Sequence, residues 1–93
     1  MTEAKLQWTC IKWLDANHIP FVRVEKASRR GAPDLFVFAR YGIIAVELKR
    51  NEKAATSPHQ EKLKNTVNAY CNFTCFFKVS NFEDFKKMVD VFN

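Results

Sequence analysis

The sequence is poor in residues that break or cross-link a chain: its 93 residues include two glycines, three prolines and three cysteines. So little glycine and proline, with 47% of the residues hydrophobic, excludes a collagen-like or low-complexity disordered chain and indicates a globular fold. Cys10, Cys71 and Cys75 are odd in number and form no Cys-x-x-Cys pair, which argues against a disulfide framework and a zinc site. We expect reduced thiols in or near the core, as in a cytoplasmic protein.

Long hydrophobic runs are also missing. No apolar run approaches the roughly 20 residues that a membrane-spanning helix needs. The N-terminal Met-Thr-Glu-Ala-Lys leads into an amphipathic stretch and not into a signal peptide. The length suits one small domain over residues 1–93, without an internal repeat. We therefore expect a single cytoplasmic domain that does not contact a membrane.

Positive charge exceeds negative charge, and it is unevenly placed. Residues 23–53 contain eight lysines and arginines against four acidic residues, so this segment carries +4 of the net charge of +5. A basic concentration of this kind attracts an anionic polymer. A net charge of +5 is also ordinary for solubility alone, so the charge by itself leaves both interpretations open.

Hydrophobic periodicity predicts the order helix, three strands, helix, strand, helix. The expected strands cover residues 20–26, 35–39, 43–48 and 73–79. The expected helices cover residues 3–16, residues 58–71, and the segment that follows a capping box at 80–83. Their apolar faces are Leu6, Cys10, Trp13 and Leu14; then Leu63, Val67, Tyr70 and Cys71; then Phe82, Phe85, Met88, Val89 and Phe92. A strand after the second helix suggests a crossover back onto the sheet.

The second and third strands form a predicted hairpin whose register can be counted. If the turn centres between Arg40 and Tyr41, the numbers of paired residues sum to about 81, which places Asp34 opposite Glu47. Directly opposed side chains have Cβ atoms roughly 5 Å apart. Because side chains alternate along a strand, Lys49 shares the face of Glu47, and the residue between them points into the core.

Two carboxylates this close repel each other unless a cation lies between them. A divalent metal such as Mg²⁺ would bind both, polarise a phosphoryl oxygen and generate hydroxide from bound water. Lys49 would orient that water or neutralise charge on the phosphate. The residues therefore predict a metal-dependent phosphodiesterase site. The alternative is that Asp34 is a turn residue, and that Glu47 and Lys49 form a solvated strand face.

The loop at residues 26–32 is basic and leads directly into this site. Arg29 and Arg30 could hold phosphates, with Gly31 allowing the backbone to approach closely. The alternative is an ordinary charged loop.

Two further polar residues have local explanations. Ser57 and Gln60 form a capping box at the start of the second helix, which accounts for Gln60, although it could instead reach a metal-bound water. Glu3 is either a third acid of the site or a first-turn residue that favours the helix dipole.

The element order, with Pro33-Asp34 at one strand and Glu47-x-Lys49 at the next, resembles the PD-(D/E)xK nuclease superfamily. More narrowly, about residues 2 to 92 resemble the virus-type replication-repair nuclease domain, VRR-NUC. The matching motifs are Glu3, Gly31-Ala32-Pro33-Asp34-Leu35, Glu47-Leu48-Lys49, Ser57-Pro58-His59-Gln60 and a Phe-rich terminal helix. The resemblance implies an α/β, restriction-endonuclease-like αβββαβ core with a mixed four-stranded sheet and an extra C-terminal helix.

The resemblance also implies roles for individual residues. Asp34, Glu47 and the backbone carbonyl of Leu48 would bind Mg²⁺, for which Mn²⁺ would substitute. Lys49 would be the catalytic lysine, Glu3 an accessory acid, and Gln60 a residue that lines the site. Contacts to DNA are expected from the basic residues around the site: Lys26, Arg29, Arg30, Arg50 and Lys53.

Small stand-alone relatives of this type are typically encoded by phages and bacteria, which implies the cytoplasm of a bacterium or of a phage-infected host. The implied activity is a metal-dependent, structure-specific DNA endonuclease that resembles a Holliday-junction resolvase. Paired cuts on a symmetric four-way junction require two active sites, so a homodimer is expected. The alternatives are a non-catalytic DNA-binding module that keeps the nuclease fold, and a small protein-interaction subunit whose basic surface is incidental.

Overall fold

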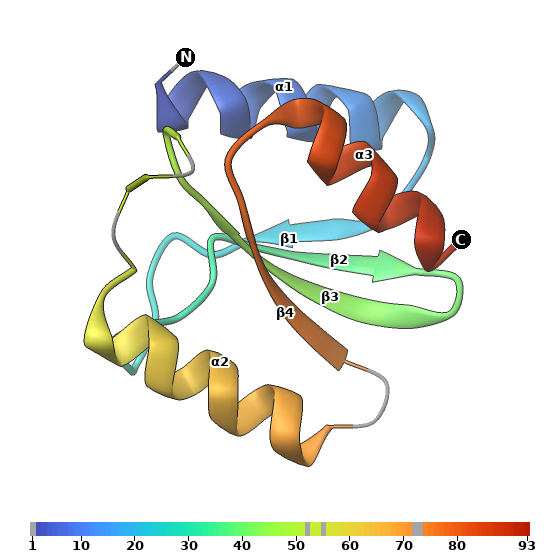
Figure 1. The fold of residues 1–93 in the computed structure, drawn as a ribbon. Coiled ribbons are helices and arrows are strands. Elements are labelled where there is room, and N and C mark those ends of the chain that lie inside the picture. The colour runs from blue at the N-terminus through green and yellow to red at the C-terminus, as the bar shows by residue number, and fades with distance from the viewer. Residues whose placement is uncertain (1, 52, 55, 72–73) are drawn as a thin grey trace.

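The computed structural model of this protein describes residues 2–51, 53–54, 56–71 and 74–93, without the side chains of residues 74–76. The elements follow the predicted order (Figure 1). They are α1 (Glu3–Ala16), β1 (Phe21–Arg23), β2 (Leu35–Ala39), β3 (Gly42–Leu48), α2 (Pro58–Tyr70), β4 (Thr74–Val79) and α3 (Phe82–Val91). Among the described residues, none of these helices is long and apolar enough to cross a membrane.

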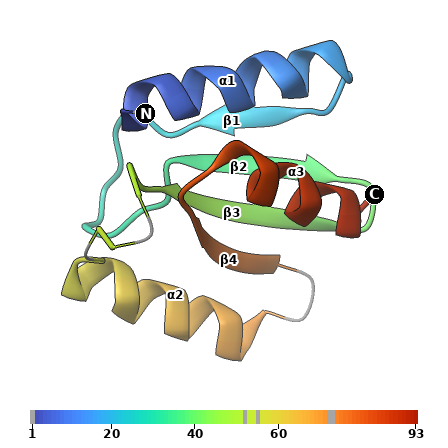
Figure 2. The same cartoon turned by 45° about the horizontal axis from the view of Figure 1, so that its top comes forward.

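The strands form one mixed sheet in the order β1-β2-β3-β4. The first three strands are antiparallel neighbours, and β4 runs parallel to β3 after the crossover through α2. Figure 2 shows α1 and α2 on opposite sides of the sheet. This is the α/β fold with a mixed four-stranded sheet and a C-terminal helix that the sequence predicted.

The hairpin of β2 and β3 has the predicted register. Its pairs run from Leu35 with Val46 to Ala39 with Gly42, so the paired numbers sum to 81. Arg40 and Tyr41 form the turn. A hairpin of known turn length leaves little freedom in its register, which is why counting from the turn succeeded.

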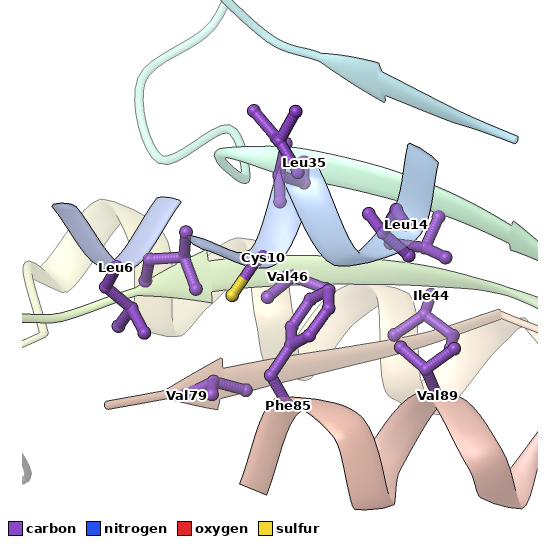
Figure 3. Close-up of a cluster of buried hydrophobic side chains, with 12 residues drawn as sticks. Leu6, Cys10, Leu14, Leu35, Ile44, Val46, Val79, Phe85 and Val89 are labelled. Atoms are coloured by element: carbon purple, nitrogen blue, oxygen red, sulfur yellow. The ribbon is translucent and has the colours of Figure 1, made fainter. Parts of the chain in front are cut away.

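The core lies on one side of the sheet, under α1 and α3 (Figure 3). Alternate residues of the central strands meet the apolar faces of the two helices. The buried members include Leu6, Cys10, Leu14, Leu35, Val37, Ile44, Val46, Phe85 and Val89. Trp13 closes the cluster with edge-to-face contacts to Phe82 and Phe85, at ring-centroid distances of 6.1 and 6.0 Å. By the same alternation, Glu47 lies on the opposite face of β3, toward α2.

Two predicted boundaries were wrong. The first strand covers only residues 21–23, because the chain leaves the sheet edge soon after Arg23 and enters the basic loop. The cap of α3 is Asn81 and not Ser80: its backbone is extended, and its side chain accepts a hydrogen bond from Asp84 N at 2.8 Å. Ser and Asn are comparable N-cap residues, so the local pattern did not separate the two positions.

The expected apolar face of α2 was also partly wrong. Leu63 and Val67 are half-buried, whereas Tyr70 is 85% exposed and Cys71 is exposed. The apolar residues recur at helical spacing to the end of α2, but the last of them extend beyond the part of the helix that packs on the sheet. Of the cysteines expected near the core, Cys10 is buried and Cys71 is not, while the side chain of Cys75 lies outside the described residues.

This difference predicts selective thiol chemistry. Burial raises the pKa of the Cys10 thiol to about 12, so little reactive thiolate forms at pH 8. In a Cys75→Ser variant, iodoacetamide should modify Cys71 readily and Cys10 roughly 100-fold more slowly or less, since Cys10 must wait for the core to open. Mass spectrometry of the alkylated peptides measures both rates. Equal rates in the folded protein would contradict the burial of Cys10.

Candidate active site

The end of the hairpin brings Asp34 and Glu47 together. Asp34 lies one residue before β2, and its charge raises the pKa of Glu47, so the two acids are close together at this end of the hairpin. Asp34 is anchored to β3 twice: its backbone N–H donates to Val46 O at 2.8 Å, and its Oδ2 accepts from Leu48 N at 2.7 Å. Asp34 precedes β2 in a bend, but its carboxylate is bound to β3 and is not a free turn side chain.

Glu47 is a charged residue whose side chain is buried. It is 1% exposed, and within the described part of the chain neither of its carboxylate oxygens has a hydrogen-bond partner. Its nearest ion-pair partner is Lys49, whose Nζ lies 3.9 Å from Oε1. Because a buried polar group without hydrogen bonds is destabilising, this carboxylate needs a further positive partner. The alternative of a solvated strand face does not apply to Glu47.

Burial raises the pKa of the Glu47 carboxyl above its ordinary value, and the charge of Asp34 raises it further. The charges of Lys49, Lys78 and Lys64 act in the opposite direction. Burial likewise raises the pKa of Asp34, against the lowering effect of the N–H group of Leu48. Two carboxyl groups that each resist ionisation are arranged as a pair that a divalent cation would stabilise.

Glu3 is exposed in the first turn of α1, and its charge contributes to the raised pKa of Asp34. The N-cap of α1 is Thr2, whose hydroxyl accepts from Lys5 N at 3.1 Å. Glu3 thus occupies the first turn, as the dipole interpretation expected, and its charge also reaches the pair of acids. Both interpretations of Glu3 remain compatible with the structure.

Gln60 has the predicted capping role and also contacts Lys49. Its backbone N–H donates to Ser57 Oγ at 3.2 Å, and its Oε1 accepts from Ser57 N at 3.3 Å, which completes the predicted capping box. The same Oε1 accepts from Lys49 Nζ, also at 3.3 Å. The cap of α2 therefore orients the lysine side chain. The backbone of Lys49 is held as well, because its N–H donates to Val79 O at 2.9 Å.

Gly31 allows a close approach, but to a different partner from the one expected. Its φ is +85°, and a Cβ at this position would lie 2.5 Å from the carbonyl carbon and oxygen of His59 and 2.8 Å from Gln60 N. Any side chain here would push the basic loop away from the first turn of α2. Gly31 therefore packs the loop against the helix that carries Gln60.

Two lysines near Glu47 were missed by the sequence reasoning. Lys78 of β4 is the parallel Cα partner of Glu47, and Lys64 comes from α2. The available signal was a lysine inside the apolar strand Thr-Cys-Phe-Phe-Lys-Val. Such a residue needs a polar partner on its own face of the sheet.

The basic residues expected at DNA lie on two exposed segments that join the site. The loop with Lys26, Arg29 and Arg30 leads into Asp34, and Arg50 and Lys53 follow Lys49 along the chain. Their side chains are exposed, as contacts to a large ligand require.

The donor set suits a cation that keeps part of its hydration. Among the described residues there is no group of three or more His, Cys, Asp or Glu side chains that could hold a metal. Asp34 and Glu47 lie close together, and Glu47 offers two buried oxygens without partners in the part of the chain that the structure describes. Mg²⁺ typically binds one or two carboxylates and retains several waters, so these residues fit it.

Removing the charge of Glu47 should stabilise the metal-free protein. In EDTA at pH 8, Glu47→Gln should raise the free energy of unfolding by about 1–2 kcal/mol, because a neutral amide is easier to bury than a carboxylate. The folded-state pKa lies above the unfolded value, so the wild type loses stability as pH rises through the raised pKa. The difference between variant and wild type should therefore grow with pH.

Urea denaturation between pH 4 and pH 8 measures this difference. Glu83→Gln is the matched control, since the side chain of Glu83 is 71% exposed and its replacement should change stability by less than about 0.5 kcal/mol. A Glu47→Gln variant that is less stable than the wild type at pH 8 would show that the Glu47 carboxylate is satisfied.

Comparison with known proteins gives a consistent fold assignment. No family model matches the sequence, and no curated protein matches it. A solved structure described as a VRR_NUC domain aligns with a TM-score of 0.80 and 25% identity over 100% of both chains. A second, a VRR_NUC domain protein, has a TM-score of 0.78 and 17% identity, covering 99% of this chain and 88% of its own. This likeness along the entire chain shows that the protein has the fold of the solved VRR_NUC domains.

Proposed function

We propose that the protein is a Mg²⁺-dependent, structure-specific DNA endonuclease that hydrolyses phosphodiester bonds. The observation that carries the proposal is the buried carboxylate of Glu47, which lacks hydrogen-bond partners among the described residues and lies beside Asp34 and Lys49. A destabilising arrangement of this kind is typical of a functional site, because the folded protein gains nothing from it without a ligand. The likeness to VRR_NUC structures supports the same conclusion.

In this proposal the metal is held by the carboxylates of Asp34 and Glu47 and by the backbone carbonyl of Leu48. Mg²⁺ bound there, or Mn²⁺ in its place, would polarise the phosphoryl oxygen and lower the pKa of a bound water. Asp34 is already fixed for this task, since its other oxygen accepts from Leu48 N. Glu3 would adjust the negative charge of the site from the first turn of α1.

Lys49 would act on the phosphate or on the attacking water. Its side chain is only 15% exposed, and its ammonium group is placed between Glu47 Oε1 and Gln60 Oε1. A lysine held in this way can stabilise charge that develops on the phosphate without losing much conformational freedom at that moment. Gln60 would keep the ammonium group in position and line the site.

The DNA would be held by its phosphates, through the exposed basic residues of the two segments beside the site. Binding should then weaken strongly as salt is raised, because each phosphate contact releases counterions. We place the protein, as one domain over residues 1–93, in the cytoplasm of a bacterium or of a phage-infected host.

We further propose that the preferred substrate is a branched DNA such as a four-way junction, and that the active form is a homodimer with two sites. The test compares an end-labelled junction with linear duplex and single strand, in Mg²⁺ or EDTA, alongside sedimentation of the protein. Paired nicks on the junction by a dimer, lost in EDTA, are expected. Equal cutting of all substrates would remove the junction preference, and binding without any cutting would favour a non-catalytic module.

Lys49→Met keeps the side-chain stem but removes the ammonium group. Its cleavage rate in Mg²⁺ should fall by about 1,000-fold or more, while DNA affinity in EDTA changes less than roughly threefold. Single-turnover kinetics and fluorescence anisotropy measure the two quantities. Lys12→Met, on the exposed face of α1, is the control for loss of one positive charge and should keep both. A Lys49→Met protein that cuts normally would remove Lys49 from the mechanism.

Asp34→Asn removes the charge while retaining an oxygen that can accept from Leu48 N. Its affinity for Mn²⁺, measured by titration calorimetry without DNA, should fall more than about tenfold, since a neutral amide is a poorer ligand than a carboxylate. Asp15→Asn, an exposed acid near the other end of α1, should bind Mn²⁺ like the wild type. Unchanged affinity in Asp34→Asn would refute the proposed ligand set.

A further inference from the structure

The turn that follows β3 is held by hydrogen bonds within the turn and by one from β4. Asn51 ties the turn to itself: its Oδ1 accepts from Lys53 N at 2.9 Å, and its backbone oxygen accepts from Ala54 N at 3.2 Å. From β4, Lys78 Nζ donates to the carbonyl oxygen of Ala54 at 2.9 Å. A side chain of the sheet therefore fixes a surface turn that lies 24 residues earlier in the chain.

Lys78 also belongs to the surroundings of Glu47. The two residues are Cα partners in the parallel pair of β3 and β4, and the Lys78 charge favours the ionised form of Glu47. The ammonium group has three donors, so one can bind Ala54 while the charge still acts on the acid. Lys78 thus links the turn to the candidate active site.

We propose that Lys78 is a positioning residue of the candidate active site. Through Ala54 it holds the turn that presents Arg50 and Lys53, so that these exposed cations face the DNA in a fixed arrangement next to Glu47. Cations that are already oriented bind phosphates at a lower entropic cost than mobile ones. This inference rests on the proposed function for its DNA contacts, whereas its claim about the turn stands on the hydrogen bonds alone.

A purely electrostatic role for Lys78 makes different predictions, and Lys64 supplies the comparison. Lys64 of α2 also favours the ionised form of Glu47, whereas the hydrogen bond to Ala54 comes from Lys78 of β4. If Lys78 only balances the buried charge, then Lys78→Met and Lys64→Met should behave alike. If it positions the turn, only Lys78→Met should loosen it, and Lys78→Arg should restore it because arginine keeps both charge and donors.

The first readout is limited trypsin digestion of the folded proteins without DNA. In Lys78→Met, cleavage after Arg50 and Lys53 should be roughly tenfold faster, as expected when a hydrogen bond from a charged group no longer opposes local opening. Cleavage after Arg29 and Arg30, in the other basic loop, should keep its wild-type rate and serves as the internal reference. Lys64→Met should digest like the wild type.

The second readout is steady-state cleavage of the substrate that the wild type cuts. Lys78→Met should raise KM roughly threefold to tenfold, whereas Lys64→Met should not, and kcat should change to a similar extent in both variants because each removes one positive charge near Glu47. Lys78→Arg should return KM to within about twofold of the wild type. Unchanged digestion of the turn in Lys78→Met, or an equal effect of Lys64→Met, would overturn the proposal. A wild type that cuts no DNA would instead refute the proposed function, while the digestion result would still decide the role of Lys78 in the turn.

Discussion

The buried charge of Glu47 is the constraint around which the site is arranged. The central strand β3 is covered on both faces. Its residues Val46 and Leu48 face the apolar core, and Glu47, on the opposite face, is also only 1% exposed. Burying a carboxylate without hydrogen bonds is unfavourable, and a second acid at Asp34 adds repulsion. Lys49, Lys78 and Lys64 offset part of this cost. A cation placed between the acids would offset the rest, so the buried carboxylate would serve as a metal ligand.

The surrounding elements each fix one group of the site. The end of the hairpin brings the acids close together, and the N–H of Leu48 orients Asp34. The capping box of α2 turns the Gln60 amide oxygen toward Lys49, while the parallel strand β4 places Lys78 beside Glu47. A feature that stabilises the fold locally, the cap of α2, therefore also orients a side chain of the candidate site, so a change at Gln60 should affect both the helix and Lys49.

The parts of the site that depend on residues close together in the sequence could be predicted, and those that depend on distant segments could not. The register from Leu35 with Val46 to Ala39 with Gly42 followed from a short turn, because a hairpin of known length has one favoured register, and it brings Asp34 near Glu47. Lys78 was missed because the register of a parallel pair depends on a crossover whose geometry has no comparable local rule. Gly31 was expected to permit a close approach, but its partner on α2 is distant in sequence. Asn81 and its neighbour Ser80 are equally good caps, and only the packed helix separates them.

The proposed function depends on Asp34 and Glu47 together binding a divalent metal. The most direct measurement is an anomalous difference map from a crystal soaked in Mn²⁺. We expect one peak between the two carboxylates, within bonding distance of both and of the Leu48 carbonyl. A map without a peak there, with Glu47 bound to Lys78 or Lys64 instead, would contradict the proposal and would make the lysines the permanent partners of the buried acid.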